Sequence, residues 1–369
     1  MKKLKSLLPL LALLLCSVHF ELNYVYLQWF IGCSLLALLI PGGTTTFKAF
    51  ISYLIFSSAN VMFNLYSPIY KTTHMDQINY GFTAAHVGFL VLLFVLSMNT
   101  IKKEWLTKLI DTLPAFGIIN SIYVIITWLF NLRLTNSMGP QGLIDYSGLN
   151  STLISYSVVA IICSKLNKKW LVPCVIAIIL SRSSIGFGVI AVGISAYLLA
   201  SGYFKKEVFL KLCLTFVAIV SIGFLSEGRE LFDSGGRLSA YSVFLSHWQV
   251  NYNTILGAGP GSFKILSYGI SKLYNFMPIP GTKDFWYWER LHSEYLQVLF
   301  EYGWVGLVLL VAALVDLAYR LFKAKEPQLF ALLMAVASSA IFNFPLRYFP
   351  SAIVCALIVT ASYSALSDE

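Results

Sequence analysis

One histidine is the first candidate for chemistry in this sequence. His292 lies at the start of the stretch LHSEYLQVLFEYGWVG (291–306), which is rich in aliphatic and aromatic residues. A neutral imidazole, whose ordinary pKa is about 6.5, can accept a proton from a hydroxyl group at neutral pH. His292 is therefore a candidate general base. An interfacial histidine that hydrogen-bonds a loop carbonyl would give the same pattern, so the spacing alone leaves both interpretations open.

The arginines form the second candidate set, because their distribution differs from that of the lysines. If the N-terminus is cytoplasmic, fifteen of the nineteen lysines fall in inner segments and six of the seven arginines in outer ones. The short inner loops then carry the positive excess, as the positive-inside rule requires. Arginine presents a rigid fork of donors that suits phosphate or carboxylate, so the set suggests an anionic ligand at the outer face. Any single one of them could instead contact lipid headgroups. The six are Arg133, Arg182, Arg229, Arg237, Arg290 and Arg347.

Two of these arginines have distinctive settings. Arg182 lies in ILSRSSIGFG between two apolar runs, and a charge close to a membrane is costly unless it faces a cavity or a partner. Arg237 follows Ser-Gly-Gly and begins a stretch whose apolar residues share one helical face, as in a helix on a membrane surface. A salt bridge from Asp233 to Arg237 is the alternative to ligand binding.

The glycines of the His292 stretch predict close helix packing. In helical register Gly303 and Gly306 share a face with His292, and small residues let a neighbouring helix approach in a bilayer. The segment LGAGPGSFK (256–264) matches no nucleotide-binding pattern and is interpreted as a turn that lets backbone pack closely. The histidines lack metal-ligand spacing, so neither a metal nor a cofactor is predicted.

The composition predicts the elements that position these residues. The chain is 58% hydrophobic and 12% charged, which favours an all-α polytopic membrane protein with about twelve transmembrane helices and one long loop at the outer face. We expect an N-terminal bundle (1–226), the long loop (227–291) and C-terminal transmembrane helices (292–369), with both termini cytoplasmic. The first span resembles a secretory signal but lacks a cleavage site, so it is expected to be retained. The candidate spans are 6–20, 24–40, 47–66, 82–101, 113–131, 147–163, 170–181, 184–203, 207–225, 293–318, 328–345 and 351–366.

The motifs together resemble the O-antigen ligase-related superfamily. His292 and Ser293, followed after nine residues by Gly303 and then Gly306, are similar to its signature. The SRSSIG, SGGRLSAY and GAGPGSF segments resemble it in the same order, so the resemblance covers roughly residues 170–320. The superfamily includes O-antigen ligases, O-antigen and exopolysaccharide polymerases, and protein O-oligosaccharyltransferases.

The resemblance implies a metal-independent, C-type glycosyltransferase in the bacterial cytoplasmic (inner) membrane, with a periplasmic active site. The donor would be a glycan on a polyprenyl (undecaprenyl) diphosphate, and the acceptor a glycan, lipid A-core or other hydroxyl, with no nucleic acid involved. By matching position, Arg182 and Arg237 would hold the diphosphate and His292 would be the base. Arg229, Arg290 and Glu294 are candidate supporting residues.

Three functions remain open from the sequence. A ligase would move a finished glycan to its acceptor, and a polymerase would join lipid-linked repeat units by the same chemistry. A polysaccharide or lipid-linked glycan transporter would also need many spans and outer arginines. It would further need polar residues spread through several spans, and this sequence has few.

Overall fold

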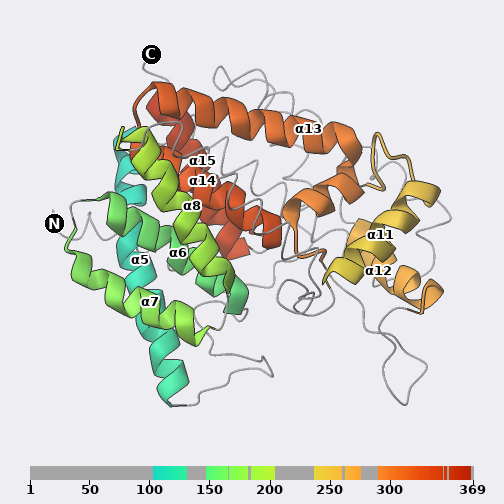
Figure 1. Ribbon diagram of the computed structural model, residues 1–369, viewed down its shortest axis with the longest axis horizontal. Coiled ribbons are helices and arrows are strands. Elements are labelled where there is room, and N and C mark those ends of the chain that lie inside the picture. The colour runs from blue at the N-terminus through green and yellow to red at the C-terminus, as the bar shows by residue number, and fades with distance from the viewer. Residues whose placement is uncertain are drawn as a thin grey trace.

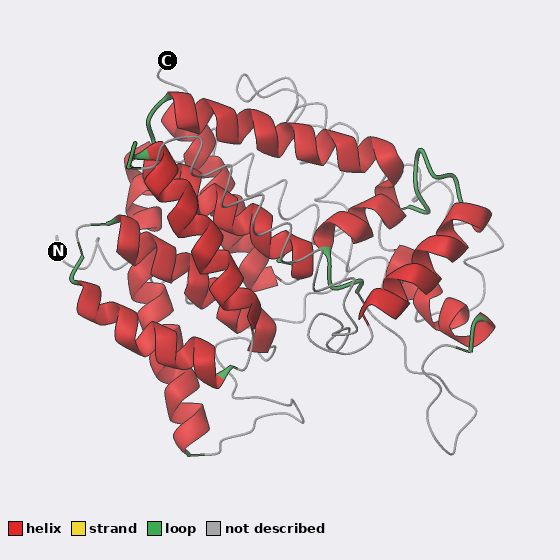
Figure 2. Cartoon of the chain, viewed as in Figure 1, coloured by secondary structure: helices red, strands yellow, loops and turns green. Residues whose placement is uncertain are grey.

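The computed structural model describes residues 103–130, 147–164, 166–181, 184–203, 237–259, 262–275, 290–343, 345–346 and 349–366. All regular structure in these ranges is helical, which fits the predicted α-helical class (Figures 1 and 2). The α-helices are α5 (Lys103–Leu129), α6 (Ser147–Cys163), α7 (Leu171–Leu180), α8 (Ser184–Ala200), α11 (Arg237–Asn251), α12 (Ser262–Leu273), α13 (Glu294–Lys323), α14 (Pro327–Phe342) and α15 (Phe349–Leu366).

Seven predicted spans coincide with helices of the structure. They are the spans that begin at 113, 147, 170, 184, 293, 328 and 351, and they correspond to α5, α6, α7, α8, α13, α14 and α15. The seventh candidate span was predicted to be too short to cross a bilayer, and α7 has 10 residues. The spans 6–20, 24–40, 47–66, 82–101 and 207–225 lie outside the described residues, so the total of twelve stays a prediction.

The helices α5, α6, α7, α8, α14 and α15 form a bundle with α6 at its centre (Figure 1). Every residue of α6 from 148 to 161 is buried, although many are serine, threonine or asparagine. Their hydroxyl groups donate mostly to carbonyls one turn back in the same helix, as Thr152 does to Gly148 and Ser155 to Ser151. Small polar residues satisfied in this way let helices approach closely, which is the packing typical of membrane bundles.

Two of the described helices, Ile110–Leu129 of α5 and Glu294–Lys323 of α13, are long and apolar enough to cross a membrane. On α13 the exposed positions include Val308, Val311, Val315 and Tyr319, which recur at helical spacing on one face. Large apolar side chains that are exposed along one face are what a lipid-facing helix requires. The described part of the chain is therefore consistent with a membrane protein.

Helix α13 is broken at Gly303, where the sequence predicted one continuous span. Gly303 has φ 66° and ψ −170°, and the first part of the helix folds back beneath the second (Figure 1). The second part, from Trp304 to Lys323, is about 30 Å long at 1.5 Å per residue, enough to span the hydrocarbon core of a bilayer. The first part, from Glu294 to Tyr302, returns toward the end of α14.

The break removes two helical hydrogen bonds. The two N–H groups and two carbonyl groups that it frees each pair with the backbone of a turn from another part of the chain. In a continuous helix the N–H groups of Trp304 and Val305 would donate to the carbonyls of Phe300 and Glu301. Here all four groups pair with the backbone of residues 254–259, which we call the insertion turn. The bonds are Ala258 N to Phe300 O (2.9 Å), Gly259 N to Glu301 O (2.9 Å), Trp304 N to Thr254 O (3.0 Å) and Val305 N to Ile255 O (3.1 Å).

The insertion turn has the local geometry to enter this gap. Asn253 precedes it and accepts from the N–H groups of Ile255 and Leu256 through its side-chain oxygen, as in an Asx turn. Gly257 has φ 84°, and a Cβ there would meet the backbone of Glu301 and Gly303. A Cβ on Gly303 would in turn meet the backbone of Ile255. The close neighbour of Gly303 is thus a turn, where the sequence predicted a neighbouring helix.

Helices α11 and α12 lie beside the bend of α13, away from the bundle (Figure 1). Phe263 stacks edge-to-face on Phe244 of α11, with ring centroids 4.9 Å apart, and on Phe300 of α13, at 5.4 Å. Pairs of this kind contribute about 0.5–1.5 kcal/mol beyond the area they bury. The apolar face of α11, predicted to lie on a membrane surface, therefore packs against α12 and the first part of α13.

The interlocked glycines give a first prediction. We expect Gly303→Ala to lower the free energy of unfolding by at least about 2 kcal/mol, because alanine is strained at positive φ and its Cβ has no room. Gly188→Ala is the matched control, since a Cβ at that position of α8 meets nothing within 4 Å. Thermal melts of the detergent-purified variants measure the difference, and equal stability of the two would contradict the interlock.

Candidate functional site

His292 lies in a short turn immediately before α13, and its backbone is left-handed. Its φ is 55°, a conformation that costs a residue other than glycine about 1–2 kcal/mol. Ser293 follows as the N-cap of α13, with its side chain accepting from Leu296 N at 3.4 Å. The helical register predicted from His292 to Gly306 is therefore interrupted twice, at the turn and at Gly303. A conformation of this kind persists only when its surroundings hold it.

Hydrogen bonds on both sides of His292 hold the turn. On the N-terminal side, the buried Leu291 N–H donates to Gln297 Oε1 at 3.2 Å. On the C-terminal side, the Tyr241 hydroxyl group donates to the His292 carbonyl oxygen at 3.3 Å. His292 as a residue is half-buried, so part of it is accessible from outside. The backbone of His292 is thereby fixed against α13 and α11 together.

The contact with Tyr241 places the start of α11 at the histidine. Arg237 begins this helix one turn before Tyr241, and residues four apart lie on the same helical face. The first turn of α11, which begins with Arg237, therefore leads directly to the residue that contacts the His292 carbonyl. A shared site for Arg237 and His292 stays a prediction. Arg290 is half-buried and lies two residues before His292. The positions of Arg182 and Arg229 lie outside the described residues.

Glu294 connects the turn to the bundle. Its side chain is only 2% exposed, and its Oε2 accepts from Leu346 N at 3.3 Å. Its own N–H donates to the carbonyl of Asn343, whose side-chain amide reaches Thr152 of α6 at 3.1 Å. The start of α13 is therefore anchored to the connection between α14 and α15 and to the central helix. This placement makes Glu294 a support for the turn.

The other histidine of this region, His247, has a different environment. Its ring packs edge-to-face on Tyr274, and Asn251 Nδ2 lies 3.2 Å from its Nδ1. Partial burial lowers the pKa of His247 below its usual value, which favours the neutral ring. It lies on α11 far along the helix from Arg237, so it serves as a comparison for His292.

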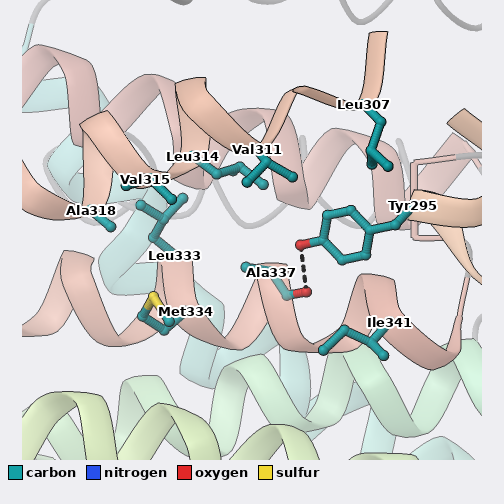
Figure 3. Close-up of a pocket in the computed structure, with 10 residues that line it drawn as sticks. All are labelled: Tyr295, Leu307, Val311, Leu314, Val315, Ala318, Leu333, Met334, Ala337 and Ile341. Carbon is teal, nitrogen blue, oxygen red and sulfur yellow. Dashed lines mark hydrogen bonds between the residues drawn. The ribbon is translucent and has the colours of Figure 1, made fainter. Parts of the chain in front are cut away.

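An apolar groove of about 430 Å³ runs between the second part of α13 and α14 (Figure 3). Tyr295 from the first part of α13 lies at one end, and its hydroxyl group donates to the Ala337 carbonyl oxygen at 2.9 Å. His292 is three residues before Tyr295, so this end of the groove adjoins the histidine turn. The other lining residues are Leu307, Val311, Leu314, Val315, Ala318, Leu333, Met334 and Ile341, all of them apolar.

Sequence reasoning did not identify Tyr241, Gln297 or Asn343 as parts of this site. A signal for Gln297 is present, because it lies four residues before Glu301 in an apolar helix, where buried polar residues are costly. Tyr241 lies 51 residues before His292 in the sequence, and Asn343 lies 51 residues after it. No local sequence pattern predicts contacts between residues so far apart.

The described residues are thus those of an α-helical protein, consistent with a membrane protein, in which α11 and α13 together hold the backbone of His292 in a left-handed turn. Residues 170–311 match a family model described as O-antigen ligase. The predicted resemblance to the O-antigen ligase-related superfamily is confirmed. The matched range contains Arg182, Arg237 and His292. No curated protein matches the chain.

The family gives a coarse function. Its members are glycosyltransferase-like ligases or polymerases of bacterial inner membranes that use lipid-linked glycans. The match begins just before α7 and ends within the second part of α13, so it includes the insertion turn, the break and the histidine turn.

The left-handed backbone gives a second prediction. We expect His292→Asn to be close to the parent in stability, and His292→Ala to be about 1 kcal/mol less stable, because asparagine tolerates positive φ better than alanine. His292→Gly should match or exceed the parent. Thermal unfolding of the three purified variants orders them, and an alanine variant as stable as the glycine variant would contradict the strained turn.

Proposed function

We propose that the protein transfers a glycan from a polyprenyl diphosphate carrier to an acceptor hydroxyl group at the outer face of the membrane, as an O-antigen ligase does. The observation that carries the proposal is the histidine turn, since His292 is held in a strained conformation by a hydrogen bond from Tyr241 of α11. A strained backbone conformation costs free energy and persists only where the surrounding structure holds it, and such conformations cluster at active sites. The family match over the same residues gives independent support.

The chemistry follows from these groups. The acceptor oxygen forms a bond to the anomeric carbon of the donor sugar, and the bond from that carbon to the diphosphate oxygen breaks. His292 takes the proton of the acceptor hydroxyl group, and the polyprenyl diphosphate leaves with the electron pair. Arginines at the outer face, Arg237 and Arg182 among them, would stabilise the negative charge that grows on the leaving group.

The groove between α13 and α14 suits the hydrocarbon tail of such a donor. It is lined by apolar side chains, and it lies on the exposed apolar face of α13 that includes Val311 and Val315. The end of the groove at Tyr295 adjoins the histidine turn, because His292 lies three residues before Tyr295. A prenyl chain in the groove would therefore present its diphosphate to His292 and the start of α11.

A polymerase is the nearest alternative, because it would use the same residues with a second lipid-linked glycan as acceptor. Transport is the alternative of another class. It would need polar groups that face a pathway, and three of the buried hydroxyl groups of α6 instead donate to carbonyls of their own helix. These are Thr152 to Gly148, Ser155 to Ser151 and Ser157 to Leu153.

The role of His292 gives a third prediction. His292→Asn should abolish transfer in proteoliposomes that contain a lipid-linked glycan donor and acceptor, because asparagine fits the turn but cannot act as a base. His247→Asn is the matched control and should retain activity. Full transfer by the His292→Asn protein would reject the assigned role.

The fate of the donor in cells gives a fourth prediction and separates the three functions. Deletion of the gene should leave long glycans on the polyprenyl diphosphate carrier, because a ligase consumes the finished chain. Analysis of extracted lipid-linked glycans makes the measurement. Single repeat units on the carrier would instead indicate a polymerase, and glycans retained at the cytoplasmic leaflet would reject both enzymatic functions.

A further inference from the structure

Two buried polar residues lie one turn apart in the first part of α13. Gln297 is 3% exposed and Glu301 is 0% exposed. The side-chain amide Nε2 of Gln297 donates to Glu301 Oε1 at 3.0 Å. A buried amide and a buried carboxylate are costly in an apolar helix, so a pair of this kind needs a structural or functional reason.

The other end of the amide faces the histidine turn. Gln297 Oε1 accepts from the Leu291 N–H, which lies one residue before His292. A carboxylate only accepts hydrogen bonds and a backbone N–H only donates, so the two partners together fix which way the amide points. Glu301 therefore orients Gln297, and Gln297 fixes the backbone on the N-terminal side of His292.

The same pair is connected to the break of α13. The backbone carbonyl of Glu301 accepts from Gly259 N of the insertion turn at 2.9 Å, and Gly257 packs against the backbone of Glu301. Tyr241 donates to the His292 carbonyl from the opposite side. A continuous set of contacts thus runs from the insertion turn through Glu301 and Gln297 to the left-handed residue.

We propose that Gln297, oriented by Glu301, is a positioning residue that holds the backbone of His292 in its left-handed conformation and so aims the imidazole at the acceptor. The inference rests on the proposed function, in which His292 is the base. Gln297 does not touch the reacting atoms in this role. Its effect on transfer passes entirely through the turn 290–293.

The mechanism sets the kinetic signature. A correctly oriented base lowers the free energy of the transition state and contributes little to the binding of either substrate. Loss of Gln297 should therefore lower kcat and leave the KM values for donor and acceptor nearly unchanged. A residue that only supports the fold would reduce the amount of folded protein and leave kcat per folded molecule as it was.

The test compares four variants in proteoliposomes, with activity expressed per folded protein after size-exclusion chromatography. Gln297→Leu should lower kcat by at least about tenfold, the usual worth of one hydrogen bond, with KM within about twofold. Gln297→Glu should lower it similarly, because two carboxylates then face each other. Glu301→Gln alone should lower kcat by no more than about threefold, since the new amide can still accept from Gln297.

The decisive variant exchanges the two side chains. In Gln297→Glu/Glu301→Gln, the carboxylate at 297 can accept from both the Leu291 N–H and the amide at 301. We expect kcat within about threefold of the parent, well above that of Gln297→Glu alone. A double variant no more active than Gln297→Glu, or a Gln297→Leu protein with the parent kcat, would overturn the proposal.

Two controls separate this inference from the proposed function. Gln249→Leu removes an exposed glutamine from α11 and should leave kcat unchanged. His292→Asn shows whether the histidine is the base at all. If His292→Asn is inactive and Gln297→Leu is fully active, only the positioning role is rejected, whereas an active His292→Asn protein rejects the function on which it rests.

Discussion

The insertion turn makes four backbone hydrogen bonds to α13 in place of the two that the helix loses at Gly303, and the arrangement of the site depends on this exchange. A break in an apolar helix leaves N–H and carbonyl groups without partners, which raises the free energy of the folded state wherever water is excluded. Residues 254–259 offer two donors and two acceptors at the positions where the helix lacks them. The exchange lets α13 fold back on itself without losing backbone hydrogen bonding, and Gly257 and Gly303 provide the space for it.

The bend has two results that concern function. It directs the first part of α13 toward the end of α14, where Glu294 contacts Asn343 and Leu346 and the histidine turn is anchored. It also leaves the apolar groove between the second part of α13 and α14, with Tyr295 of the first part at one end (Figure 3). The histidine turn and the apolar groove thus adjoin each other because one helix changes direction between them.

Local pattern predicted much of the fold, and its failures have a physical cause. Hydrophobic runs located seven helices of the described chain, including the short α7, because burial and helix formation depend on neighbouring residues. The close backbone packing predicted for the segment 256–264 from its glycines is confirmed at Gly257, whereas residues 262–264 begin α12. The sequence did not predict the break at Gly303, because the backbone groups that compensate for its lost hydrogen bonds come from residues more than forty positions earlier. The same holds for Tyr241, whose contact with His292 exists only after α11 and α13 pack together.

The exchange of hydrogen bonds also bears on the order in which the chain assembles. Residues 254–259 are synthesised before 300–305, so the donors and acceptors that complete the break exist before the helix that needs them. A continuous α13 satisfies its own backbone and can enter the bilayer alone, whereas the bent form requires the insertion turn to be in place. Formation of the histidine turn therefore depends on the placement of residues 254–259, and a chain in which that segment misfolds would favour the straight helix.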